Sequence, residues 1–547
     1  MSKRLQYQEI SLPVGQLRGA VRTTIYNDRY YSFEGIPYGQ PPIGDLRFKA
    51  PLAAQPWQGV KDCTNFSTIK PIQRNKASGR VEGAEDCLYL NVFAKKLHTL
   101  MLLPVMVYIF GGGFNEGAAI RSLYGPDYFM QKDVVLVTLN YRVDSLGFLS
   151  VKDPSLQIPG NAGLKDQILA LKWVKKFIRY FNGDPDNITL FGNSVGSASV
   201  HYLSATNQTR GLFHKAICMS GTMLSSRASI PAQDYAYRLA QQHGYEKENN
   251  DRKVIEYLQS LEAEKLVQHD LLTPEDRRNG FRLTFAPVVE PYESEHCVVS
   301  QEQQKMLHSA WSNEIPIIFG STANEGLLLY SQLQNYTQII ESFRTDPATI
   351  LPYLVKINNN ETVNEELAQV LFKLHFSKES NELEDVVNYF GIRDFWHGFH
   401  RTLLSRLAYA KAPTYYYRFA FDSPTFNHFR KKHTAGRVTK GASHAEELSY
   451  LWYADHSWKL NKTSVEYNMI QRMVSLFTNF ATKRRHNSLN KWHKKEESAA
   501  LIWRPLQAGN PYMALNIAEI LQMKEVPEKE ELHVWDSTYA NNHGLLF

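Results

Sequence analysis

Short apolar runs of strand length alternate along the chain with stretches in which apolar residues recur at every third or fourth position. The runs are rich in β-branched and aromatic residues and end at glycine or polar turns, which is typical of buried strands. Their alternation with amphipathic helices predicts an α/β protein with a mainly parallel central sheet that helices cover on both faces. Strands are predicted at 105–110, 134–141, 188–191, 215–219, 315–319 and 415–421, and helices at 162–180, 195–204 and about 467–477.

One long region departs from this alternation. From about residue 340 to 410 the chain lacks strand signals and is predicted to be helical. No internal repeat, low-complexity tract or linker rich in glycine, serine or proline divides the chain. Its 547 residues, 43% hydrophobic and 21% charged, have an ordinary globular composition. We therefore expect residues 1–547 to form a single α/β domain with a helical region at about 340–410.

Charge and hydropathy exclude several classes of function. The net charge of +6 is mildly basic, and the basic clusters at 430–433 and 483–486 carry no interleaved aromatic pattern. We predict that both clusters are solvated surface and that the protein binds no nucleic acid. The most apolar stretch, 100–110, contains Pro104 and is well short of the roughly 20 residues that span a bilayer. No transmembrane segment is therefore expected.

The chain termini and the cysteines bear on location and on metal binding. The first ten residues are polar and charged and lack the apolar core of a secretory signal, which predicts an intracellular, cytoplasmic location. Four cysteines without metal-ligand spacing predict neither a disulfide scaffold nor a metal site. The oligomeric state is left open by these features.

A G-x-S-x-G pentapeptide, Gly192-Asn193-Ser194-Val195-Gly196, joins a predicted strand to a predicted helix. In that context the serine lies on a tight turn that exposes its hydroxyl, and the two glycines avoid clashes with neighbouring backbone. The pentapeptide alone is a weak signal, because any glycine–serine loop can match it. The strand before it and the helix after it make Ser194 a candidate nucleophile, against the alternative of a plain surface turn.

A run of three glycines, Gly111-Gly112-Gly113, follows the predicted strand at 105–110. Glycines let backbone N–H groups approach a ligand without a Cβ atom in the way. A serine nucleophile requires such donors for the oxyanion that forms during its attack. The alternative is an ordinary glycine-rich turn. The three-glycine run lies roughly 80 residues before the pentapeptide, which is the order of the α/β-hydrolase layout and favours an oxyanion hole over an ordinary turn.

The same layout requires an acid and then a histidine after the serine in the chain. Glu325 lies in a loop beyond the predicted strand at 315–319, where a carboxylate of the site would be expected. His444 lies in a short loop between a strand and a polar turn. The chain has 18 histidines, however, and pattern and spacing alone do not select His444 among them.

Several longer motifs are far more specific than the pentapeptide. The motifs are Tyr31-Ser-Phe-Glu-Gly-Ile-Pro-Tyr38, Pro41-Pro-Ile-Gly-Asp-Leu-Arg-Phe48, Glu85-Asp-Cys-Leu-Tyr-Leu-Asn91, Tyr141-Arg142 with Leu146-Gly-Phe148, and Pro159-Gly-Asn-Ala-Gly-Leu-Lys-Asp-Gln167. By these motifs the chain resembles the carboxylesterase/cholinesterase family from about residue 12 to the C-terminus, and most closely the insect α-esterases.

The resemblance implies an α/β-hydrolase fold, an ester substrate and no metal or cofactor. It also assigns roles to individual residues, and it implies a disulfide bond, which a reducing cytosol would disfavour. The implied roles are a catalytic triad of Ser194, His444 and Glu325, an oxyanion hole of Gly112, Gly113 and Val195, and a first disulfide between Cys63 and Cys87.

Four positions near the implied site differ from the family pattern. Asn193 and Val195 replace the glutamate and alanine that usually flank the serine, so a buried charge is lost and a stiff β-branched residue is gained. Phe110 stands where a histidine or other polar residue often precedes the glycines. Arg227 aligns with a tryptophan of the acyl pocket, and an unpaired arginine would be costly to bury there. We expect Phe110 and Arg227 to contact substrate.

Three hypotheses for function follow from these residues. The leading one is a serine carboxylic-ester hydrolase that forms an acyl-enzyme, acting on small lipophilic or xenobiotic esters. The first alternative is an esterase-like protein whose distorted oxyanion hole makes turnover slow, so that it binds or sequesters esters and organophosphates. The second is an adhesion-type relative that lacks catalysis. The complete set of triad residues favours the first hypothesis.

A further expectation concerns the N-terminal part of the chain. Arg47 and Glu85 each lie in one of the family motifs. We expect them to form a partly buried ion pair, with the two side chains within about 4 Å of each other.

The substitution Val195→Ala tests the departure next to the serine. The branched Cβ of Val195 is expected to misdirect the N–H that faces the oxyanion. If it does, the variant should have a higher kcat and a nearly unchanged KM, because that contact is made chiefly in the transition state. We expect a gain of about tenfold, alone or combined with Asn193→Glu. Acylation and deacylation rates for a short and a longer nitrophenyl ester measure it. Unchanged rates would show that Val195 is accommodated without cost.

Overall fold

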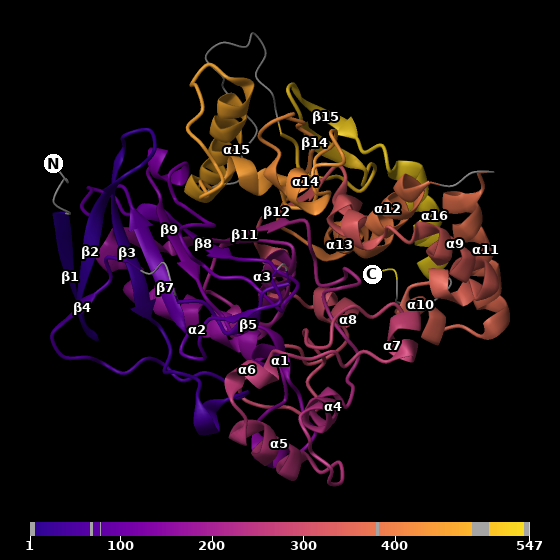
Figure 1. Ribbon diagram of the computed structural model, residues 1–547. Helices are drawn as coiled ribbons and strands as arrows, with labels where there is room; N and C mark the ends of the chain where they lie inside the picture. Colours follow the sequence, from indigo (N-terminus) through magenta and orange to yellow (C-terminus); the bar gives the residue numbers. More distant parts are fainter. Residues whose placement is uncertain are drawn as a thin grey trace.

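A large twisted sheet runs through the middle of the protein (Figure 1). The computed structural model describes residues 6–65, 69–76, 78–378, 382–483, 503–540 and 546. Thirteen strands form this sheet, in the order β1-β2-β3-β7-β9-β8-β10-β11-β12-β13-β14-β15, with β4 paired to β2. Pairing is parallel from β9 through β14 and antiparallel toward both edges, except that β4 pairs with β2 in parallel. The prediction of a mainly parallel central sheet is therefore confirmed.

Strands β8, β9, β11, β12 and β13 match the predicted runs to within a few residues, and β10 is longer than its predicted run at both ends. The antiparallel strands at the N-terminal edge and the two C-terminal strands were not among the predictions. The strands are β1 Gln6–Leu12, β2 Gly15–Thr23, β3 Arg29–Pro37, β4 Val60–Asp62, β5 Gln73–Arg74, β6 Val81–Glu82, β7 Tyr89–Ala94, β8 Leu103–Ile109, β9 Val135–Leu139, β10 Gly183–Asn193, β11 Lys215–Met219, β12 Ile317–Thr322, β13 Thr414–Phe419, β14 Met513–Ile517 and β15 Leu521–Glu525.

Helices pack on the sheet where apolar residues recur at helical spacing. The predicted helices at 162–180, 195–204 and about 467–477 correspond to α2, α3 and α15. The α-helices are α1 Asp144–Phe148, α2 Ala162–Phe177, α3 Val195–Ala205, α4 Tyr235–Gln242, α5 Asp251–Ser260, α6 Ala263–Leu266, α7 Pro274–Arg278, α8 Gln303–His308, α9 Tyr336–Thr345, α10 Tyr353–Ile357, α11 Glu361–Phe376, α12 Leu383–Gly391, α13 His397–Tyr409, α14 His428–His433, α15 Val465–Thr482 and α16 Lys529–Ala540.

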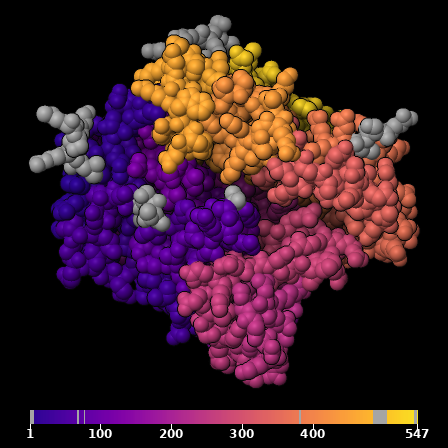
Figure 2. Space-filling model, viewed as in Figure 1, coloured from indigo at the N-terminus to yellow at the C-terminus, as the bar shows by residue number. Residues whose placement is uncertain are grey.

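The centre of the sheet is the core of the molecule. Every residue of β8, β9 and β11 is buried, as expected of parallel strands covered on both faces. The predicted helical region is also observed, since the described residues from Tyr336 to Tyr409 form helices and no strand. Helices α9 and α11 of this region lie at the right of the molecule in Figure 1, and Figure 2 shows α4 and α5, in magenta, projecting at its lower end.

No helix among the described residues combines the length and the apolar character needed to cross a membrane.

The expected ion pair between Arg47 and Glu85 is present and bidentate. Arg47 Nε and Nη2 each donate to a Glu85 carboxylate oxygen at 2.7 Å, and the two side chains are 8% and 14% exposed. The third nitrogen, Nη1, donates to the carbonyls of Leu258, Gln259 and Leu261 at the C-terminal end of α5. A cation there satisfies carbonyls that lack an intrahelical donor and complements the helix dipole.

The implied disulfide between Cys63 and Cys87 is not formed. Both cysteines are free and buried. Burial raises the pKa of Cys63 to about 12, and it raises the pKa of Cys87 well above its usual value, with Asp166 adding to the effect. Disulfide formation requires a thiolate. Both thiols are therefore enclosed in the core, where burial disfavours the reactive thiolate.

The Arg47 contacts predict an order of stabilities. Arg47→Met leaves Glu85 unpaired and removes the donor to three carbonyls, so we expect a loss of about 3–5 kcal/mol. Glu85→Gln keeps the shape of its side chain and leaves the carbonyl contacts intact, so its loss should be smaller. Apparent melting temperatures of the two variants and the parent test this order. Equal melting temperatures for all three proteins would contradict a stabilising role for the pair.

Candidate active site

Ser194 lies on a sharp turn between β10 and α3. Strand β10 ends at Asn193, α3 begins at Val195, and Ser194 has φ 58° and ψ −128°. A residue other than glycine in such a conformation is strained by about 1–3 kcal/mol. The turn is held by the Ser194 N–H, which donates to the Met219 carbonyl at 2.8 Å. The predicted strand–turn–helix context of this serine is therefore present.

Close backbone packing explains the second glycine of the pentapeptide. A Cβ atom on Gly196 would lie 2.3 Å from the carbonyl oxygen of Ile109. Any side chain at this position would push α3 away from the end of β8, and with it the turn that carries Ser194. The glycine is thus required by the approach of two backbone segments.

The three-glycine run forms a turn whose amides are free to bind an anion. Gly112 and Gly113 have φ of 119° and 65°, and the Gly112 carbonyl accepts from the N–H groups of Asn115 and Glu116. Within the described part of the chain, the N–H groups of Gly112 and Gly113 donate to no other residue. Val195 opens α3, where backbone N–H groups lack intrahelical acceptors. These are the donors that an oxyanion hole requires.

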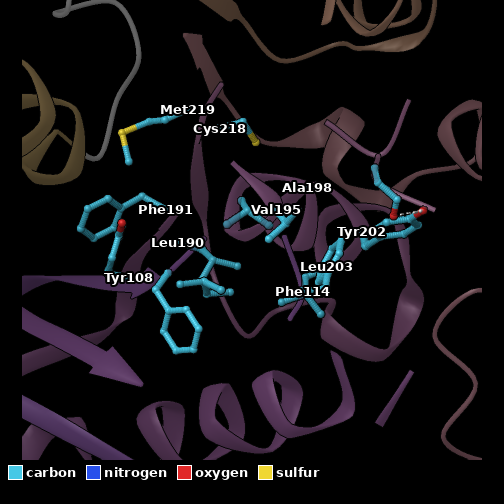
Figure 3. Close-up of a cluster of buried hydrophobic side chains, with 14 of the residues drawn as sticks. Tyr108, Phe114, Leu190, Phe191, Val195, Ala198, Tyr202, Leu203, Cys218 and Met219 are labelled. Atoms are coloured by element: carbon cyan, nitrogen blue, oxygen red, sulfur yellow. Dashed lines mark hydrogen bonds between the residues drawn. The ribbon is translucent and has the colours of Figure 1, made fainter. Parts of the chain in front are cut away.

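The side chain of Val195 packs into the core. It is 7% exposed and belongs to a cluster of buried hydrophobic side chains that also contains Phe191 and Ala198, drawn in Figure 3. The neighbouring Asn193 side chain is buried as well, and its Nδ2 atom has no hydrogen-bond partner among the described residues. A buried donor without an acceptor costs about 1–3 kcal/mol, so Asn193 is an energetic liability beside the candidate nucleophile.

Glu325 and His444 form a short, buried contact. His444 Nδ1 lies 2.5 Å from Glu325 Oε2, and the second carboxylate oxygen accepts from the Thr322 N–H at 2.7 Å. The side chains are 4% and 0% exposed. The carboxylate therefore holds the imidazole in one orientation. His444 Nε2 is buried and has no hydrogen-bond partner among the described residues, which leaves it available to accept a proton.

The structure selects His444 among the histidines by its partner. Other histidine–carboxylate contacts exist, between His269 and Asp144 and between Asp536 and two histidines of α13. Glu325, however, follows β12, and β10, β11 and β12 are neighbours in register. The carboxyl ends of parallel strands lie at one edge of a sheet. Glu325 and its histidine therefore leave the sheet at the same edge as Ser194.

Contacts between the loops agree with this placement. The Asn324 N–H donates to the Ala442 carbonyl at 2.9 Å, which joins the segment of the acid to the segment of His444. The Ser220 N–H donates to the Gly320 carbonyl, and the Ser220 hydroxyl donates to Glu447 at 3.4 Å. Because Ser220 follows the Met219 carbonyl that holds the Ser194 turn, the three segments are linked.

The basic cluster at 430–433 is only partly the solvated surface that was predicted. Lys431 and Lys432 are exposed, but Arg430 is 3% exposed, pairs with Asp422 and donates to the Gly441 carbonyl at 2.9 Å. His433 Nδ1 lies 2.8 Å from the Ser443 hydroxyl, and burial lowers the pKa of His433 to about 3. The prediction is wrong for Arg430 and His433, because α14 supports the loop before His444. The cluster at 483–486 lies largely outside the described residues.

Two further glutamates beside the site were missed in the sequence. Glu446 and Glu447 follow His444 closely and are both fully buried. Burial, with the nearby negative charge of Glu325, raises the pKa of Glu447 to about 8. Burial also raises the pKa of Glu446 to about 7, although backbone N–H groups of Phe429 and Arg430 oppose the shift. Two acidic residues in a polar turn gave no signal of burial.

Phe110 is not at a substrate-accessible surface. Its ring is fully buried and stacks on Tyr141 with centroids 4.4 Å apart, and the Tyr141 hydroxyl donates to the Phe110 carbonyl at 2.9 Å. The expected contact with substrate is therefore not supported. Phe110 instead packs beneath the glycine turn.

Arg227 is partly exposed and pairs with a buried carboxylate. Its side chain is 22% exposed, and Nε donates to Asp394 Oδ2 at 3.0 Å. Asp394 lies 167 residues from Arg227 in the chain and pairs with its charge, so the arginine is not buried without a partner.

Comparisons with known proteins agree with this geometry. The sequence model of a protein family described as "Carboxylesterase family" matches residues 6–535 of the chain. The chain belongs to the carboxylesterase family. This carboxylesterase is 34% identical to Esterase B1 of Culex pipiens, over 98% of its length and 99% of that protein. It is 30% identical to a juvenile hormone esterase of Tribolium castaneum, over 85% and 82% of the two chains.

A solved structure also resembles the carboxylesterase over its whole length. The crystal structure of juvenile hormone esterase from Manduca sexta, with OTFP covalently attached, aligns with a TM-score of 0.83 and 27% identity. The alignment covers 98% of this chain and 100% of the other. The carboxylesterase therefore has the α/β-hydrolase fold, and it is a serine hydrolase of carboxylic esters.

The described residues of the carboxylesterase contain no group of three or more histidine, cysteine or acidic side chains arranged to hold a metal ion.

Glu447 predicts a pH dependence of stability. Because its pKa is about 8 in the folded protein and 4.5 in an exposed chain, the folded state binds more protons between these values. Its unfolding free energy therefore falls as pH rises through that range and levels off above about pH 8. Glu447→Gln removes this loss. We expect the melting temperature of the variant, relative to the parent, to rise from pH 5 to pH 8. A constant difference would contradict the raised pKa.

Proposed function

We propose that Ser194, His444 and Glu325 perform the ester hydrolysis. The observation that supports this assignment most directly is the buried 2.5 Å contact between His444 Nδ1 and Glu325, which leaves Nε2 without a partner at the edge of the sheet where Ser194 lies. No hydrogen bond joins Ser194 to Nε2 in the unliganded protein. Such contacts are often long before substrate binds and shorten in the complex.

The reaction follows from the positions of these groups. His444 Nε2 takes the hydroxyl proton as Ser194 Oγ attacks the ester carbonyl, and the carbonyl oxygen becomes an oxyanion. The N–H groups of Gly112, Gly113 and Val195 stabilise that charge, each donor being worth about 10²–10³ in rate. The C–O bond to the alcohol then breaks, and His444 protonates the leaving oxygen. Water attacks the acyl-enzyme in the same way and releases the acid.

The substrates we propose are small lipophilic or xenobiotic esters. Apolar side chains lie beside the reacting groups, since the Phe395 ring is 4.7 Å from that of His444 and a Cβ atom on Gly113 would lie 3.9 Å from Leu283. Relatives named juvenile hormone esterase and para-nitrobenzyl esterase differ in the ester that their names specify, which supports a range of esters rather than a single one.

A second candidate function is slow turnover with sequestration of the ester. The buried, unpartnered Asn193 amide next to Ser194 favours it, because strain beside the nucleophile would misplace the oxyanion donors. The time course of nitrophenol release separates the two functions. Steady release supports the enzyme, whereas a burst equal to the amount of protein, followed by little turnover, supports sequestration.

Ser194→Ala tests the assignment of the nucleophile. Removing the hydroxyl should lower turnover of nitrophenyl esters by at least about 10⁴-fold and abolish labelling by a fluorescent phosphonate. Ser204→Ala is the matched control, because Ser204 lies on the same helix and its hydroxyl only donates to the Val200 carbonyl. Parental activity in a folded Ser194→Ala protein would exclude Ser194 as the nucleophile.

A further inference from the structure

Three arginines gather around a single buried carboxylate close to the candidate triad. Asp394 is 3% exposed and accepts from Arg227 Nε at 3.0 Å and from the Ser226 hydroxyl at 2.8 Å. Arg393 Nε lies 3.5 Å from the same carboxylate, and its side chain is 7% exposed. Burial alone would raise the pKa of Asp394, but Arg227 and Arg393 outweigh it and hold the pKa below its usual value. Asp394 is therefore ionised.

Arg282 is the third arginine of this cluster. It is exposed, and it forms no ion pair with any residue in the described part of the chain. The surrounding protein still desolvates its guanidinium and, together with the positive charges of Arg393 and Arg227, lowers the pKa of Arg282. The charge of Arg277 lowers the pKa of Arg282 as well, whereas the carboxylate of Asp394 raises it.

Each arginine lies on a segment that also touches the candidate site. Arg393 precedes Phe395, whose ring packs on His444. Arg282 precedes Leu283, and a Cβ atom placed on Gly113 would lie 3.9 Å from the Leu283 side chain. The segment of Arg227 begins at Gly221, where a Cβ atom would lie 2.2 Å from the Ser194 carbonyl oxygen. The three arginines are therefore carried by segments that contact the nucleophile turn, the base and the glycine turn.

A π-helical turn places Asp394 and Phe395 in different surroundings. Residues Ile392–Trp396 form this turn between α12 and α13. Such turns are rare and occur frequently at functional sites. Here the turn directs Asp394 toward Arg227 and Phe395 toward His444. It is also fixed to the segment of the acid, because Gly391 lies against Gly326, the residue after Glu325.

Charge balance distinguishes this cluster from a simple structural ion pair. One guanidinium would neutralise Asp394, and Arg227 does so with good geometry. Arg393 shares the Asp394 carboxylate with Arg227, and Arg282 has no ion-pair partner among the described residues, so the cluster carries a net positive charge that favours an anion. Guanidinium groups bind carboxylates through two parallel N–H donors, and they lose less solvation than ammonium groups when they do so.

We propose that Arg227, Arg282 and Arg393 form an anion subsite beside the triad, and that the enzyme prefers esters bearing a second, ionised carboxylate. The inference rests on the proposed function of Ser194, since the subsite positions the far end of an ester whose carbonyl that serine attacks. Asp394 holds the arginines apart and in place. Leu283 and Phe395 are apolar and lie next to the glycine turn and His444, so the preferred ester has a short apolar segment between carbonyl and carboxylate.

Matched ester pairs test the subsite. 4-Nitrophenyl hydrogen glutarate and 4-nitrophenyl pentanoate place a carboxylate or a methyl group at the end of the acyl chain. 4-Acetoxybenzoate and phenyl acetate differ by a carboxylate or a hydrogen atom on the ring of the alcohol part of the ester. For the parent protein we expect kcat/KM to favour the charged member of one pair by about tenfold, as for one charge-assisted hydrogen bond. The pair that shows the preference identifies the side on which the carboxylate lies.

Two variants and a control assign the preference to the cluster. Arg282→Gln should lower the charged-to-neutral ratio of kcat/KM about tenfold, and Arg227→Gln should also lower it. Arg277→Gln is the control, because it removes the same charge from a nearby exposed arginine that is paired with Asp270. The control should keep the parental ratio. Arg282→Gln leaves every described ion pair intact, so it remains informative if Arg227→Gln does not fold.

The outcomes separate the subsite from the proposed function. Normal hydrolysis of the neutral esters without a preference for the charged ones overturns the subsite alone. The subsite is also overturned if Arg282→Gln keeps the parental ratio, or if Arg277→Gln lowers it equally. Failure to hydrolyse either neutral ester, or hydrolysis that survives Ser194→Ala, overturns the proposed function instead.

Discussion

The close approach of backbone segments around Ser194 is the constraint on which the site depends. A Cβ atom on Gly196 would lie 2.3 Å from the carbonyl oxygen of Ile109, and one on Gly221 would lie 2.2 Å from that of Ser194. The end of β8, the start of α3 and the loop after β11 are therefore in contact through bare backbone. This packing holds Ser194 in a strained conformation, and the parallel register of β8, β10 and β11 supplies the rigidity to sustain it.

The same edge of the sheet concentrates buried charge. Glu325, Glu446 and Glu447 are all enclosed, and only Glu325 has a histidine as its partner. Burial raises the pKa of Glu446 to about 7 and that of Glu447 to about 8, which limits the negative charge beside the candidate triad near neutral pH. Arg430 fixes the loop before His444 from outside through backbone carbonyls. The imidazole thus has one carboxylate partner that orients it.

The helical region between 336 and 409 contributes more than a cover for the sheet. Its π-helical turn brings Phe395 to His444 and Asp394 to Arg227, and the adjoining Gly398 packs on the backbone of Leu224 and Ser225. The surroundings of the triad are therefore set by a segment that lies far from Ser194 and Glu325 in the chain. A change of substrate preference can arise in this region without any change in the reacting groups.

The sequence by itself determined the parallel strands β8 to β13, the helices α2, α3 and α15, and the turn at Ser194, because hydrophobic period and glycine position are local properties of the chain. It also placed Glu325 correctly after a strand. Pattern and spacing alone did not select His444, which only the resemblance to a known family singled out. Nor did the sequence show that Arg430 is buried, that Phe110 stacks on Tyr141, or that Cys63 and Cys87 are free. Arg227 and Asp394 are 167 residues apart, and no local pattern records such a pairing. Those features were decided only by the tertiary structure, because burial and ion pairing depend on which distant segments meet.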